Sequence, residues 1–113
     1  MDASVDLSDG ENVLTGSGWY EQGRVGSAMT VSSGVFTFPS TGKWMVIFNG
    51  FGNKTPATPY WTIRIYKTVN DGGAWTKVAE SGNAFGDSDA FAHVLAGYLF
   101  DMTDVSNYKV KFA

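Results

Sequence analysis

Apolar residues alternate along an extended segment near the middle of the chain, and there they fill both faces. Trp44, Val46 and Phe48 lie on one face, because successive side chains of a β-strand point to opposite sides of the sheet. Met45 and Ile47 lie on the other face. A strand with one solvated face alternates apolar with polar residues instead. The segment is therefore predicted to lie between two hydrophobic layers, one the core and the other a subunit interface.

A turn precedes this strand and joins it to a shorter one. Residues 35–38 form a strand that ends at Pro39, which cannot donate a hydrogen bond to a neighbouring strand. Ser40-Thr41-Gly42 completes the turn, since glycine adopts backbone angles that other residues avoid. The stretch from Phe36 to Phe48 is predicted to form a hairpin.

Further alternating segments, separated by turn-forming residues, predict strands over most of the chain. Between segments 60–67 and 75–80, Asn70-Asp-Gly-Gly73 is the strongest hairpin signal, because its residues tolerate positive φ angles. No window of about eleven residues or more shows helical spacing. We predict one all-β domain over residues 1–113, an antiparallel jelly-roll sandwich with an acidic lead-in at residues 1–11. The remaining expected strands are 12–14, 19–22, 28–31, 91–102 and 108–112.

The strand at 91–102 is also apolar on both faces, so it too is predicted to separate two hydrophobic layers. We assign Leu95 to the core, and Tyr98 and Phe100 to the subunit interface together with Met45 and Ile47. For the strand from Trp44 to Phe48, alternation alone does not fix which face points inward, and the reverse assignment stays open. The predicted core consists of Phe36, Phe38, Trp44, Val46, Phe48, Ile63, Ile65, Leu95, Val110 and Phe112.

Composition narrows the classes of function. The chain of 113 residues has a formal net charge of −3 and no basic residue before Arg24, so no basic patch for nucleic acid is expected. Cysteine is absent, which excludes disulfides and thiolate metal sites. The N-terminal residues lack the features of a secretory signal, and the apolar run 94–100 is too short to span a bilayer. We expect a soluble protein that binds neither nucleic acid nor membrane.

The sequence offers no arrangement that is typical of an enzyme. It contains no nucleophile elbow, zinc-binding spacing of histidines or complete phosphate-binding loop. The single histidine, His93, shares a face with Phe91 and Leu95, which favours a hydrogen-bonded core or interface histidine over a base. Binding of an axial ion by three copies of His93 is the less favoured alternative. Asp87 and Asp89 suit calcium, but a solvated loop is favoured, and no resident cofactor is expected.

Exposed aromatic side chains near the ends of loops are the candidates for binding a ligand. Such rings stack on sugar rings when they are solvent-accessible. For Trp19 and Tyr60 the favoured alternative is packing in the core, because each begins an expected strand. The candidates are Trp19, Tyr20, Tyr60 and Phe85.

One spacing resembles a known family. Phe36, five residues, Gly42, and then Trp44, Val46 and Phe48 at alternate positions are similar to the signature of the complement-type and tumour-necrosis-factor-like globular head. The segment from Asp101 through Tyr108-Lys-Val-Lys-Phe112 resembles the final hairpin of that family. Phage virion and fibre proteins contain similar heads with the sequence motifs Phe-Thr-Phe-Pro-x-Thr-Gly and Thr-Asp-x-Ser-Asn. The resemblance covers roughly residues 27–112.

The resemblance implies a jelly roll that trimerises about a three-fold axis and binds ligands through loops at the apex or at subunit junctions. The chain departs from the family pattern upstream, where Met29 and Arg24 stand at positions that usually hold an aromatic residue or leucine and an asparagine or aspartate. It also ends at Ala113, where such heads usually have one more strand. Three expectations stay open for that strand: it is absent from the protein, it is supplied by another segment, or it is missing only from the chain as given.

Our principal hypothesis is a non-enzymatic phage virion protein, the homotrimeric head of a fibre or spike that binds a host-surface receptor, favoured to be a glycan. Its location would be the virion, assembled in the host cytoplasm together with other virion proteins. A capsid decoration protein at a symmetry axis is the second hypothesis, with residues 1–11 as a docking arm. A carbohydrate-binding module of an enzyme is the third, and it predicts a monomer.

Overall fold

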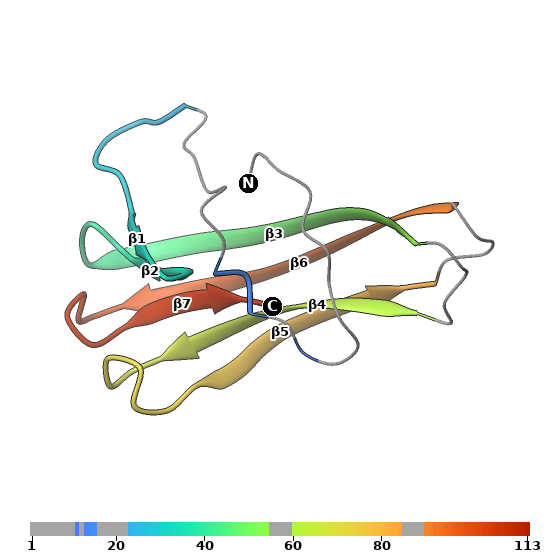
Figure 1. Cartoon of the computed structure of the whole chain (residues 1–113). Helices are drawn as coiled ribbons and strands as arrows, with labels where there is room; N and C mark the ends of the chain where they lie inside the picture. The colour runs from blue at the N-terminus through green and yellow to red at the C-terminus, as the bar shows by residue number, and fades with distance from the viewer. Residues whose placement is uncertain (1–10, 12, 16–22, 55–59, 85–89) are drawn as a thin grey trace.

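Seven β-strands make up the regular structure of the described part of the chain (Figure 1). The structure is a computed structural model, and it describes residues 11, 13–15, 23–54, 60–84 and 90–113. These ranges contain no helix, and the prediction of an all-β fold is confirmed. The strands are β1 (Thr30–Ser32), β2 (Val35–Thr37), β3 (Gly42–Lys54), β4 (Trp61–Thr68), β5 (Thr76–Asn83), β6 (Ala90–Met102) and β7 (Lys109–Phe112).

The strands form two antiparallel sheets. One sheet has five strands in the order β1-β2-β7-β4-β5, and the other pairs β3 with β6 over 13 residues of each strand. Figure 1 shows these two long strands running side by side along the length of the molecule. Buried side chains from both sheets meet in one core, as in a β-sandwich.

The stretch from Phe36 to Phe48 is not a hairpin, because β2 and β3 belong to different sheets. β2 pairs with β1 and β7, whereas β3 pairs with β6. The connection between them crosses from one sheet to the other, and the Nε1 of Trp44 donates a hydrogen bond to the Ser40 carbonyl at 3.1 Å. The hairpin prediction was wrong because a Pro/Gly turn marks a reversal of the chain but not the sheet to which it returns. β6 and β7 likewise lie in different sheets.

Aromatic rings from both sheets fill the core. The ring of Phe38 lies 5.7 Å from that of Trp44 and 5.3 Å from that of Phe100, measured between centroids. The ring of Phe112 lies 5.4 Å from Phe36 and 5.0 Å from Phe48. The predicted core residues that are buried, or partly buried against this core, are Phe36, Phe38, Trp44, Val46, Phe48, Ile63, Ile65, Val110 and Phe112.

The two faces of β6 are exchanged relative to the prediction. Leu95 is 55% exposed rather than buried, and Phe100 is only 4% exposed and belongs to the core. Tyr98 is partly buried against the core, with its ring edge-on to Phe100. Placing Tyr98 and Phe100 with Met45 on one face was therefore wrong. Either the even-numbered or the odd-numbered side chains of a strand point inward, and a shift of one residue exchanges the two sets. A strand that is apolar on both faces carries no local signal of which set points inward.

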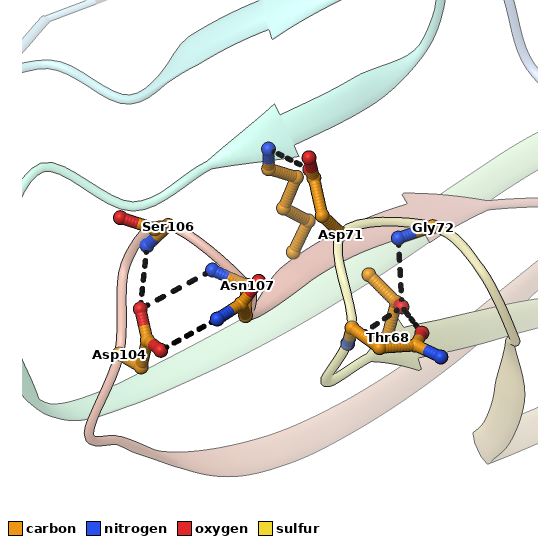
Figure 2. Close-up of polar contacts among 8 residues, drawn as sticks. Thr68, Asp71, Gly72, Asp104, Ser106 and Asn107 are labelled. Carbon is orange, nitrogen blue, oxygen red and sulfur yellow. Dashed lines mark hydrogen bonds and ion pairs between the residues drawn. The ribbon is translucent and has the colours of Figure 1, made fainter.

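Two turns meet at one end of the sandwich (Figure 2). The predicted hairpin turn between β4 and β5 is confirmed, with positive φ angles at Asp71 (55°) and Gly72 (90°). The hydroxyl of Thr68, a residue only 1% exposed, accepts hydrogen bonds from the backbone N–H groups of Asn70 (3.3 Å) and Gly72 (2.9 Å) and donates one to Asn70 Oδ1 (2.8 Å). The buried hydroxyl of Thr68 thus fixes the backbone of the turn through three hydrogen bonds.

Replacing Thr68 with valine is expected to destabilise the fold by about 1 to 3 kcal/mol, because the three hydrogen bonds of the hydroxyl are lost at about 0.5 to 1.5 kcal/mol each. Thr68→Ser, which keeps the hydroxyl, is the matched control and is expected to lose less. Urea unfolding monitored by tryptophan fluorescence measures both variants. Equal stability of the valine and serine variants would contradict this role of the hydroxyl.

The second turn joins β6 to β7 and is held by the carboxylate of Asp104. That carboxylate accepts hydrogen bonds from the side chain of Asn107 at 2.8 Å and from the backbone N–H of Ser106 at 2.9 Å. The backbone N–H of Asp71 donates to the Asn107 carbonyl at 2.9 Å, and Lys109 forms an ion pair with Asp71. The Asn107 and Ser106 hydrogen bonds hold the pKa of Asp104 below its usual value.

Because the pKa of Asp104 is lowered by folding, its ionised form stabilises the folded state above the unfolded-state pKa, near 4. That contribution is lost as the pH falls through the folded-state pKa. We therefore expect Asp104→Ala to be less stable than the wild type at pH 7, and expect the difference to shrink towards pH 3. Denaturation curves at a series of pH values test this, and a difference independent of pH would contradict it.

Candidate functional site: the outer face of the two-stranded sheet

The side of the β3–β6 sheet that points away from the core carries a row of exposed apolar side chains. Side chains at even positions of both strands, such as Val46 and Phe100, pack inward, so those at odd positions point outward. We call this surface the outer β3–β6 face. It consists of Lys43, Met45, Ile47, Asn49 and Phe51 from β3, and Phe91, His93, Leu95, Gly97, Leu99 and Asp101 from β6.

The register between β3 and β6 determines which side chains are neighbours on this face. Residues directly opposite each other in an antiparallel pair have neighbouring side chains. The opposed pairs from one end are Lys43–Asp101, Met45–Leu99, Ile47–Gly97, Asn49–Leu95 and Phe51–His93. Along the face, a charged pair is thus followed by aliphatic residues, then by two diagonal pairs, the polar residues Asn49 and His93 and the aromatic residues Phe51 and Phe91.

The apolar part of the face is large for a single chain. Its six large apolar side chains are between 55% and 70% exposed, namely Met45, Ile47, Phe51, Phe91, Leu95 and Leu99. At about 150 to 250 Å² for an aromatic ring and about 100 Å² for an aliphatic side chain, they leave roughly 500 Å² of apolar surface in water. Patches of this size mark interaction sites more often than ordinary surface.

A hydrogen-bonded polar pair interrupts the apolar row. The Nε2 of His93 contacts the Oδ1 of Asn49 across the two strands. The backbone carbonyl of His93 also accepts a hydrogen bond from the Nδ2 of Asn83 on β5, at 3.0 Å. The imidazole is exposed, so the core alternative for His93 was wrong, and its role as an interface residue stays a prediction. Because its ring is already paired, the face is polar at this point without an unsatisfied group.

The two ends of the face differ in character. At one end, Phe51 and Phe91 stack with their ring centroids 5.2 Å apart and their planes 4° from parallel. At the other end, Lys43 and Asp101 form an ion pair of 3.3 Å whose side chains are 69% and 70% exposed. An exposed pair of this kind stabilises a single chain little. Both charges therefore remain accessible to a partner.

The outer side of the five-stranded sheet is polar and internally paired by contrast. Arg64 bonds Glu80 at 2.6 Å, and Lys77 bonds the same carboxylate at 2.7 Å. The hydrogen bonds from Lys77 and then Arg64 lower the pKa of Glu80, and the bond to Glu80 raises the pKa of Arg64. The ammonium of Lys111 lies 4.6 Å from the ring centroid of Trp75. This surface has the character of a solvated sheet face.

Of the other residues predicted to bind a ligand or a metal ion, the structure describes Tyr60. Tyr60 precedes β4 and is 70% exposed, so packing in the core is wrong and a ligand-binding role stays a prediction. Among the described residues no group of three or more His, Cys, Asp or Glu side chains is placed to hold a metal ion. No helix in that part of the chain is long and apolar enough to cross a membrane. The candidates that lie outside the described residues are Trp19, Tyr20, Phe85, Asp87 and Asp89.

Sequence reasoning found one half of the face and missed the other. Met45 and Ile47 were assigned correctly to a surface away from the core, and the same alternation continued to Phe51 would have added this ring. Leu95 and Leu99 were missed because both faces of their strand are apolar. Only the pairing of Met45 with Leu99 in the register shows which face of β6 points outward.

Together these features define an antiparallel all-β sandwich with one polar, internally paired sheet face and one exposed apolar sheet face. Comparison of the chain with models of protein families, with curated proteins and with solved structures gave no match.

Proposed function

We propose that the protein is a non-enzymatic structural protein of a phage virion, the homotrimeric jelly-roll head of a fibre or spike. In this proposal the outer β3–β6 face is the surface through which the copies assemble, and loops bind a host-surface receptor, favoured to be a glycan. The observation that carries the proposal is the exposed apolar row from Met45 to Phe51 and from Phe91 to Leu99. In a single chain this row stays in water, which is unfavourable.

The size of the face supports self-association. A standard protein interface covers about 800 Å² on each partner, and about 56 to 65% of it is apolar. An apolar surface of roughly 500 Å² matches that share. The charged pair Lys43–Asp101 at one end and the polar pair Asn49–His93 within the row supply the polar groups that such interfaces also carry.

The order of the strands supports a jelly roll of the tumour-necrosis-factor-like kind. The connections from β2 to β3, β3 to β4, β5 to β6 and β6 to β7 each lead from one sheet to the other, whereas β4 and β5 form a hairpin. Repeated crossing between two antiparallel sheets is the connectivity of that architecture. Among the described residues the smaller sheet consists of β3 and β6.

The virion and receptor parts of the proposal rest on the sequence resemblance to phage heads around Phe36-Thr-Phe-Pro39 and Thr103-Asp-Val-Ser-Asn107. Tyr60 is the described aromatic residue that supports a sugar-binding role, because it is 70% exposed immediately before β4.

Light scattering of the purified protein at micromolar concentration tests the assembly, and a mass of three chains is expected. Immunogold electron microscopy of the phage that encodes the chain then locates it, with labelling at fibre tips expected. Binding of the trimer to host cells, and its loss after enzymatic removal of surface glycans, tests the receptor role. A monomer contradicts the proposal, and labelling over the capsid would favour the decoration protein instead.

A further inference from the structure

A glycine interrupts the middle of the outer β3–β6 face. Gly97 lies opposite Ile47, and Leu95 and Leu99 flank it on the same side of β6. All three neighbours carry side chains that are between 55% and 63% exposed. The missing side chain therefore leaves a notch among the aliphatic side chains of the row.

In the part of the chain that the structure describes, neither backbone angle nor close contact requires glycine at position 97. The backbone of Gly97 does not have the positive φ that favours glycine, and an added Cβ would lie 3.6 Å from the Val46 carbonyl oxygen and 3.9 Å from Ile47 Cγ1, both ordinary contacts. Gly50, on the inner side of β3, differs because a Cβ there would come within 3.1 Å of Ile63 and Val94. Glycine weakens the interior of a strand, and one reason to find it there is the close approach of another molecule.

A second copy of the chain is the partner that fits this notch. The same face offers both the notch and the protruding apolar side chains, such as Met45 and Leu99, that would fill it. It also carries both signs of charge at one end, Lys43 and Asp101, so two copies need not bring like charges together. We infer that Gly97 is the seat for an apolar side chain from the outer β3–β6 face of a neighbouring copy, an inference that rests on the proposed self-association.

Filling the notch tests this inference. Gly97→Leu is expected to remain folded, with a thermal midpoint no lower than that of the Met45→Asp variant, in which the face is blocked, because its Cβ meets only ordinary contacts. Its dissociation constant for assembly, measured by analytical ultracentrifugation, is expected to rise at least about tenfold. Gly97→Ala is expected to give a smaller rise and covers the case in which the larger side chain disturbs the fold.

Thr76→Leu is the matched control, since it adds the same side chain at an exposed strand position outside the face and is expected to assemble as the wild type does. Met45→Asp serves as the reference that blocks the face. If Met45→Asp prevents assembly while Gly97→Leu and Gly97→Ala assemble with unchanged affinity, the notch is not a seat, although the face remains the interface. A monomeric wild type would overturn the inference and the proposed assembly together.

Discussion

Replacing Met45 and Leu99 together with aspartate is expected to convert the assembled protein to a folded monomer. The two residues face each other across the strands and are 63% and 55% exposed, so their loss leaves the core intact. Each apolar side chain buried in an interface contributes about 1.5 to 3 kcal/mol, and two adjacent carboxylates would also repel those of the neighbouring copies. An increase of at least about 100-fold in the dissociation constant follows. Sedimentation equilibrium over a range of protein concentrations measures it.

The control for this experiment is a pair of exposed apolar residues outside the face. Val31 and Val69 are 43% and 51% exposed and lie in β1 and in the turn after β4. Val31→Asp with Val69→Asp adds the same charge and is expected to leave the mass in solution unchanged. Assembly of the Met45→Asp, Leu99→Asp variant with the affinity of the wild type would contradict the assignment of the outer β3–β6 face.

Phe38→Ala is expected to destabilise the monomer by about 3 to 5 kcal/mol, the largest loss of stability among the variants considered. Phe38 is 2% exposed and its ring contacts those of Trp44 and Phe100, so it links the connection after β2 to both strands of the smaller sheet. Because the core is closely packed, its neighbours relax only partly into the cavity that the ring leaves. Urea unfolding in the monomeric Met45→Asp, Leu99→Asp background separates this loss from any effect on assembly.

Phe51→Ala removes the same ring from the outside of the sandwich and is the counterpart of Phe38→Ala. Its side chain is 70% exposed and stacks only on the equally exposed Phe91 among the ring contacts described. A loss of about 0.5 to 1.5 kcal/mol in the monomer is expected from the stacked pair, together with weaker assembly in the wild-type background. A loss as large as that of Phe38→Ala would show that the aromatic end of the face contributes to the core.

The positions of β2 to β7 could be predicted from the sequence because alternation and turn residues are local signals. In the weakly patterned segment before them the expected strand 12–14 was wrong, since residues 13 and 14 are not in a strand. Ile63 and Ile65 alternate with the polar residues Thr62 and Arg64, so the inward face of β4 was evident before any partner was known. The hairpin at Asn70-Asp-Gly-Gly73 was equally evident, because few residues tolerate its backbone angles. These predictions needed no information about distant segments.

The candidate site could be predicted only in part, because it is made by two strands that lie about fifty residues apart in the chain. Met45 and Ile47 were placed outside the core from their own strand. Leu95 and Leu99 could not be placed, since each face of β6 satisfies the hydrophobic pattern equally well. The contact between His93 and Asn49 likewise depends on the register between β3 and β6.

The sequence by itself determined that this protein is an all-β chain with a surplus of apolar side chains on two long strands. The tertiary structure alone decided that β2 and β3 enter different sheets and that the even-numbered side chains of β6 point inward. The physical reason is that a strand's own pattern specifies how many of its faces are apolar. The partner to which it hydrogen-bonds specifies which face points inward and which sheet the strand joins.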